Sequence, residues 1–208
     1  AWVGVLHILE DVSDAHITIF SIGQSIWILF SFATDASQKA VCAVASNLIG
    51  AKRLRDIRPA LRSGLRLQLL FAGVLAIPLV LFPNYLINYF LPSDLGTQAI
   101  SELRDYARIG CFWLWIAFLM DAFTWVIAGV LTAAGDTFFI MIMSAVGSWA
   151  FGIVPTYVLI KLRHGAPDMT MAIIAVFTVL MALSFYLRYR SGYWYRKIQS
   201  SITELRAT

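Results

Sequence analysis

The chain has 208 residues, of which 60% are hydrophobic and only 13% are charged. Its mean hydropathy of +0.75 lies well outside the range of soluble globular domains. The formal net charge of +4 comes without a Gly-rich phosphate loop, a basic domain or an RNA-binding signature, so we expect no nucleic-acid partner. Cys42 and Cys111 lack C-x-x-C spacing, and we interpret them as small core residues, not as a disulfide or a metal site.

The chain opens with an apolar run, residues 1–9, that is too short to span a bilayer. No charged n-region or cleavage site marks this run as a signal peptide. We therefore expect the chain to begin inside a membrane span, as a fragment of a longer protein.

The first complete span is expected at about residues 15–34, and its helical pattern continues to residue 49. Asp35 and Lys39 are four residues apart, so they can pair on one helix face. Asp35 lies about 30 Å from the start of this helix, which predicts a position near the far membrane boundary. An interfacial Asp–Lys pair and a functional role for Asp35 both stay open. Polar candidates follow helical spacing along this element: Gln24, Ser31, Asp35, Gln38 and Lys39.

Four further spans are expected, at residues 65–90, 109–135, 138–160 and 169–187. Pro78 and Pro83 are predicted to kink or end the first of these four. The last one is the least polar, and we expect it at the periphery of the bundle. The turn Gly135–Thr137 is very short, so the spans on either side of it are antiparallel neighbours. Small residues recur every four positions after that turn and predict a close helix contact, at Ser144, Ser148 and Gly152.

The polar segments between the spans divide the basic residues unevenly. Eleven of the sixteen fall on one side and four on the other, and Lys39 lies inside a helix. The positive-inside rule places the eleven-residue side in the cytoplasm. Tyr and Trp residues interleave with the last basic residues, as is typical of the membrane–water interface at the end of a span. We therefore predict that a transmembrane lobe over residues 1–187 ends there and that residues 188–208 form a basic cytoplasmic tail. The eleven residues are Lys52, Arg53, Arg55, Arg58, Arg62, Arg66, Arg188, Arg190, Arg196, Lys197 and Arg206.

A single ionised group stands at the centre of the 109–135 span. Asp121 lies roughly 20 Å along the helix from Arg108 on one side and from Asp136 on the other. The hydrocarbon slab is about 30 Å thick, so this carboxylate is expected near its midplane. A charge held there costs about 2.5–3.5 kcal/mol even on the lenient insertion scale, which favours a functional role over a purely structural one.

Three motifs carry a resemblance to a known family. Residues 45–53, ASNLIGAKR, are similar to its V-G-x-x-L-G-A-G stretch, and residues 128–137, AGVLTAAGDT, are similar to its G-x-L-R-G-x-G-D-T turn. Residues 152–155, GIVP, resemble the G-x-P of its eleventh helix. In order and spacing the chain resembles the C-terminal half of a multidrug and toxic compound extrusion (MATE) transporter. The resemblance implies an all-α polytopic membrane protein: one six-helix lobe of a twelve-helix transporter, with its first helix truncated, in a plasma (bacterial inner) membrane.

The resemblance also gives Asp121 a role. It falls where sodium-coupled members place a cation-coupling aspartate on the tenth helix. The sequence departs from the family pattern in two ways: Thr132 stands where an Arg is usual, and Asp35 with Lys39 adds charge on the eighth helix. The family's first-half proline and aspartate site and most of its seventh helix are absent from this sequence, so the coupling ion stays open between H⁺ and Na⁺.

The residues around Asp121 suit an organic cation. Phe118 and Trp125 share its helical face, and Thr124 lies beside it. A carboxylate flanked by aromatic rings can bind a lipophilic cation through charge pairing and cation–π attraction. A proton, or a sodium ion held by Asp121, Thr124 and a carbonyl oxygen, is the competing use of the same site.

We therefore predict cation-coupled antiport of organic cations by alternating access, in multidrug efflux. A lipid-linked saccharide flippase of the same superfamily is one alternative, but it would need a more Arg-lined cavity; a non-transporting membrane scaffold is another. An enzyme is not expected, because neither H-E-x-x-H nor G-x-S-x-G occurs. The expected partners are lipophilic cationic small molecules, membrane lipids and the N-terminal lobe, with no cofactor besides the coupling ion.

Overall fold

A computed structural model describes residues 2–90 and 97–199. The end of the predicted tail, residues 200–208 with Arg206, lies outside the described residues. All elements within the described part are helical. They are α1 (Trp2–Glu10), α2 (Asp14–Gly50), η1 (Leu54–Asp56), α3 (Ile57–Ala76), η2 (Ile77–Leu81), α4 (Pro83–Phe90), α5 (Thr97–Ala133), α6 (Thr137–Gly147), η3 (Ser148–Ile153), α7 (Val154–Thr156), η4 (Tyr157–Leu162) and α8 (Met169–Arg190).

Five helical segments of the described residues are long and apolar enough to cross a bilayer. They are Asp14–Gly50, Leu54–Leu81, Arg104–Ala133, Thr137–Leu162 and Met169–Arg190.

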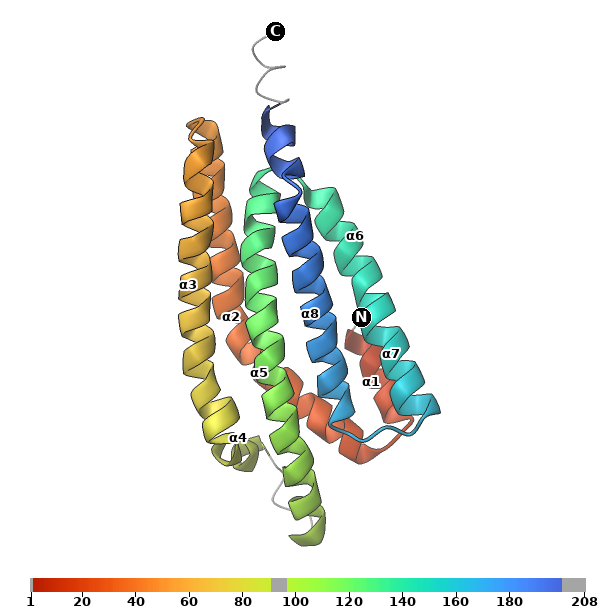
Figure 1. Cartoon of the computed structure of the whole chain (residues 1–208). Helices are drawn as coiled ribbons and strands as arrows, with labels where there is room; N and C mark the ends of the chain where they lie inside the picture. Colours follow the sequence, from red (N-terminus) through yellow and green to blue (C-terminus); the bar gives the residue numbers. More distant parts are fainter. Residues whose placement is uncertain (1, 91–96, 200–208) are drawn as a thin grey trace.

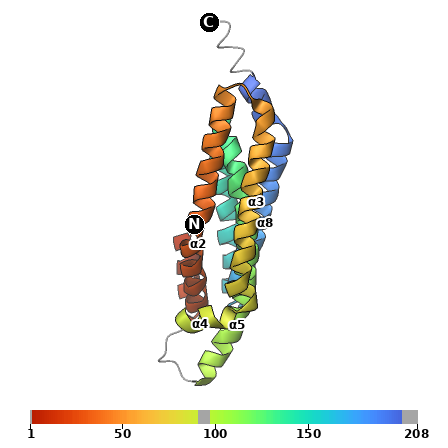
Figure 2. The ribbon, with the colours of Figure 1, turned by 90° about the vertical axis from the view of Figure 1, so that its left-hand side faces the viewer.

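Helix α5 forms the centre of the bundle. Figure 1 shows α2 and α3 on one side of it and α8 on the other, with the α6–α7 segment beyond α8, and these neighbours are in contact. Seen at right angles, α1 and the first half of α2 form one side of the molecule (Figure 2). Each long helix runs between the same two ends of the bundle, as a membrane-spanning lobe requires.

The buried side chains form two apolar clusters at different heights. One cluster takes Phe20 and Ile26 from α2 and Phe118 from α5. The other takes Val41 from α2 and Val126 from α5. The stretch of each helix between the clusters therefore carries the polar residues that neither cluster accommodates.

Helices α2 and α5 touch backbone to backbone at Gly129. A Cβ atom there would lie 2.7 Å from the Gln38 carbonyl oxygen and 3.3 Å from the Cys42 nitrogen. Only a glycine leaves room for this approach, as at other close helix crossings in membranes. The crossing fixes how far the polar stretch of α2 lies from that of α5.

The second span differs from the expected residues 65–90. It begins at Leu54, so its first turns carry the basic residues, and it ends at Leu81. The cause of the early end is Pro78, which lacks an N–H. The last turn widens into a π-helix in which the Phe82 N–H donates to the Ile77 carbonyl oxygen over 2.9 Å. Pro83 then opens the separate helix α4, where its missing N–H costs nothing.

The expectation that the last span is peripheral is wrong. Helix α8 packs along α5, and half of its apolar window is buried, against 6% for Thr137–Leu162. Low polarity did not distinguish the two spans, because lipid and protein interior are equally apolar.

Candidate functional site

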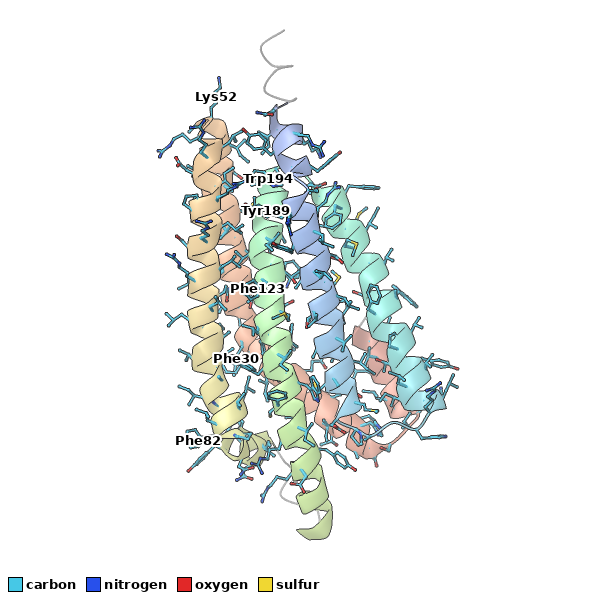
Figure 3. All side chains as sticks on the ribbon, viewed as in Figure 1. Phe30, Lys52, Phe82, Phe123, Tyr189 and Trp194 are labelled. Carbon is cyan, nitrogen blue, oxygen red and sulfur yellow. The ribbon has the colours of Figure 1, made fainter. Side chains whose placement is uncertain are left out.

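A cavity of about 360 Å³ lies in the middle of the bundle, between the two apolar clusters. Its walls come from α1, α2, α5, the α6–α7 segment and α8. Asp121 lines it from α5, two residues before Phe123, which marks this height in Figure 3. A concave site with a few polar groups in an apolar wall is the usual form of a small-molecule pocket.

The Asp121 carboxylate is positioned by its own helix. The Trp125 indole Nε1–H, one turn further along α5, donates to Asp121 Oδ1 over 2.9 Å. Trp125 itself lines the cavity, so its ring and the carboxylate face the same space. This bond fixes the side-chain rotamers of both residues without supplying a positive charge.

Asp35 joins Asp121 in the same cavity. It projects from α2 and is exposed, and the two carboxylates are close enough to repel each other when both are ionised. The predicted pair with Lys39 is absent from the ion pairs of the described residues, and Lys39 does not line the cavity. A bound cation or proton would relieve the repulsion between Asp35 and Asp121.

Five hydroxyl groups of the cavity present acceptors, because their hydrogens are already used. Thr124 donates to the Met120 carbonyl oxygen over 3.1 Å. Four other hydroxyls of the lining also donate to carbonyl oxygens of their own helices, and the oxygen lone pairs stay available. These are Ser31 (to Ile28, 3.0 Å), Ser148 (to Ser144, 2.6 Å), Thr156 (to Gly152, 2.8 Å) and Thr178 (to Ala175, 2.8 Å).

No Lys, Arg or His is among the described residues that line the cavity. The site therefore offers two carboxylates and a set of hydroxyl oxygens, with no charge to balance them. Such a donor-poor, acceptor-rich pocket is matched by a cation and mismatched by an anion.

Phe118 does not line the cavity. It is buried and stacks on Trp27, with ring centroids 4.5 Å apart and an angle of 15° between the planes. Trp27 lines the cavity instead. It lies three residues after Gln24 and four before Ser31, so its place on the polar stripe was the signal that could have identified it.

The remaining stripe residues separate from the site. Gln24 lines a smaller neighbouring cavity of about 190 Å³, which also contains Trp27. Gln38 lies at the α2–α5 crossing, where its carbonyl oxygen faces Gly129. Of the five predicted stripe residues, the structure brings only Ser31 and Asp35 to the Asp121 cavity.

The sequence did not predict the cavity wall that the α6–α7 segment and α8 form opposite α2 and α5. Ser144, Ser148 and Gly152, interpreted from the sequence as a helix-packing seam, line the cavity together with Thr156 and Thr178. Small polar residues at helical spacing fit both roles, and only the position of the neighbouring helices distinguishes them.

The family model that describes MatE proteins matches residues 5–158, which contain the α1, α2, α5 and α6–α7 walls of the cavity. The chain belongs to the MatE family. The predicted family and the predicted all-α polytopic membrane fold are thereby confirmed. MatE proteins are membrane transporters and not enzymes, which supports the prediction that this chain is not an enzyme. No curated protein matches the chain.

Proposed function

We propose that this MatE transporter exchanges organic cations for a coupling cation by alternating access, and that the Asp35–Asp121 cavity binds both. The observation that carries the proposal is the lining itself: two carboxylates, five hydroxyls whose hydrogens are already used within their own helices, and no basic side chain among the described lining residues. A saccharide flippase would need positive charge to hold a lipid-linked phosphate, so the same lining argues against that alternative.

The apolar part of the lining favours a lipophilic substrate. The rings of Trp27 and Trp125 and the side chains of Ile173 and Ile174 surround the carboxylates. Aromatic faces attract organic cations, whereas a small hydrated metal ion gains little from them. One cavity can thus bind a bulky cation through rings and charge, and a proton or sodium ion through oxygen atoms alone.

Shared carboxylates provide the coupling. When a proton or sodium ion neutralises the site, an organic cation loses its main attraction, and the reverse also holds. Each ligand therefore displaces the other, and that competition is the requirement for antiport.

We propose further that a second lobe of the transporter closes the cavity on the side where Asp35 is exposed. The end of the bundle that carries Lys52, Tyr189 and Trp194 (Figure 3) would face the cytoplasm of a bacterial inner membrane, as the excess of basic residues indicates.

The test is drug-stimulated ion flux in proteoliposomes that contain the full-length transporter, with sodium and proton gradients compared. In Asp121→Asn, we expect coupled flux to fall at least about 100-fold, because the amide keeps the shape but cannot bind a cation as an ion pair. Asp105→Asn is the matched control, since Asp105 is an exposed carboxylate of the same helix outside the cavity. Coupled flux of wild-type size in Asp121→Asn would contradict the proposed site.

A further inference from the structure

A second cavity, of about 840 Å³, lies at the basic end of the bundle. Figure 3 shows this end around Lys52, Tyr189 and Trp194. The cavity separates the start of α3 from the end of α8 and the turn that follows α8. Its polar lining consists mainly of Arg55, Arg58, Arg62 and Arg190, with the rings of Tyr189 and Trp194.

The four arginines have no carboxylate partners in the part of the chain that the structure describes. Two described carboxylates lie at this end, and both are engaged elsewhere. Asp56 pairs with Arg53 over 2.7 Å, and Asp136 pairs with Arg188 over 2.8 Å. This cavity therefore has the opposite charge to the Asp35–Asp121 cavity and serves a different ligand.

The aromatic side of the cavity is held in place. Tyr189 and Trp194 stack with centroids 5.5 Å apart, and Trp194 Nε1 donates to the Tyr189 carbonyl oxygen over 3.0 Å. Arg58 lines the same cavity from the facing helix, opposite Tyr189.

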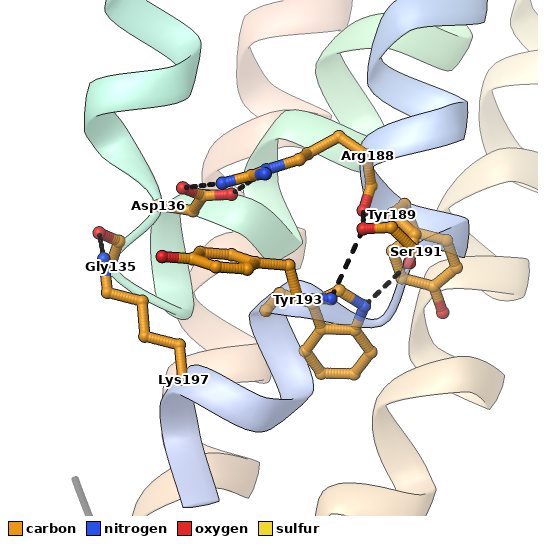
Figure 4. A network of polar contacts seen from close by, with 8 residues as sticks. Gly135, Asp136, Arg188, Tyr189, Ser191, Tyr193 and Lys197 are labelled. Carbon is orange, nitrogen blue, oxygen red and sulfur yellow. Dashed lines mark hydrogen bonds and ion pairs between the residues drawn. The ribbon is translucent and has the colours of Figure 1, made fainter. Parts of the chain in front are cut away.

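The turn behind this side is anchored as well. Arg188 forms two hydrogen bonds to Asp136, and Lys197 Nζ donates to the Gly135 carbonyl oxygen over 2.7 Å (Figure 4). A ligand that enters the cavity thus meets a preformed wall and pays little ordering cost.

We infer that this cavity binds the phosphate group of an anionic membrane lipid. Guanidinium groups match phosphate oxygens in pairs, and basic pockets between transmembrane helices hold anionic headgroups. Tyr and Trp side chains are suited to the headgroup level of the bilayer. Leu61 and Leu65 line the cavity one to two turns further into the membrane than Arg58, where they can contact the glycerol and upper acyl chain.

Native mass spectrometry of the full-length transporter tests the inference, by titration with phosphatidylglycerol, with phosphatidylcholine of the same chains, and with inorganic phosphate. The variants are Arg58→Gln/Arg62→Gln, the charge-retaining Arg58→Lys/Arg62→Lys, and the control Arg108→Gln/Arg163→Gln. The control removes the same charge from exposed arginines at the opposite end.

We expect phosphatidylglycerol to bind in preference to phosphatidylcholine, and the Gln variant to weaken that binding about 25-fold. The affinity of the Lys variant for phosphatidylglycerol should lie between those of the Gln variant and the wild type, which also shows that the site still folds. The control variant should change this affinity less than about twofold. The inference would be overturned if the control variant lost as much affinity for phosphatidylglycerol as the Gln variant. It would also be overturned if both lipids bound equally, or if inorganic phosphate bound as tightly as phosphatidylglycerol.

Discussion

At the scale of single residues, the candidate site is defined by hydrogen bonds that are already made. Trp125 donates to Asp121, and Thr124 donates to the Met120 carbonyl oxygen, so neither group has a free hydrogen to offer a ligand. A ligand must therefore bring its own hydrogen-bond donors or its own positive charge. Asp121 could be singled out from the sequence, but the direction of these bonds could not, because it depends on rotamers that only the packed helices select.

Asp35 provides a prediction at this scale. Replacing Asp35 by Asn removes one of the two carboxylates and should weaken binding of a fluorescent lipophilic cation roughly tenfold, since a charge several ångströms away in a partly wet cavity contributes about 1–2 kcal/mol. Fluorescence titration of the purified full-length transporter measures the affinity. A neutral analogue of the same dye should bind both proteins alike, and an unchanged affinity for the cation would exclude Asp35 from the site.

At the scale of helices, the α2–α5 crossing sets the distance between the two carboxylates. A side chain at Gly129 cannot be accommodated by a rotamer change, because its Cβ would meet backbone atoms of α2. We expect Gly129→Val to lower the free energy of unfolding by about 1–3 kcal/mol and to displace α2 from α5.

Gly73 supplies the matched control for that substitution. It also lies inside a helix, α3, but a Cβ there would meet nothing within 4 Å. Gly73→Val therefore carries the same change in helix propensity without the clash. Thermal unfolding in detergent should show a clear drop in melting temperature for Gly129→Val alone, and equal drops in both variants would refute the close crossing.

The link between α1 and α2 is tied to the far end of the α6–α7 segment by one ion pair. Lys161 Nζ lies 2.7 Å from Asp11 Oδ2, and this hydrogen bond holds the pKa of the Asp11 carboxyl below its ordinary value of 3.8. The stability that the pair contributes is therefore present above pH 3.8 and is lost as the pH falls through the lower folded-state pKa.

We expect Asp11→Asn to lower the melting temperature slightly at pH 5 to 7, by the same amount across that range. The difference from the wild type should shrink once the pH falls below 3.8. High salt should also reduce it, because both partners are exposed and the pair is screened. A difference that grows on acidification would contradict the assignment.

At the scale of the whole molecule, hydropathy and three motifs were enough to predict the fold class and the family. They could not predict which spans are central. The apolar faces of α8 and of Thr137–Leu162 look alike in the sequence, since lipid and core select the same side chains. The meeting of the two carboxylates was also beyond the sequence: only the packing of α2 on α5 brings Asp35 to the same cavity as Asp121.

The contacts at the end of α8 have a mechanical consequence. Arg188 and Lys197 fasten that end to the turn after α5, and Gly129 seats α5 on α2, so the α2, α5 and α8 walls of the Asp35–Asp121 cavity form one stiff block. The Thr137–Leu162 wall is mostly exposed in the described part of the chain and contains two π-helical stretches whose wide turns can shift register without breaking the helix. Expansion or collapse of the cavity then requires this wall to bend while the other three keep their spacing.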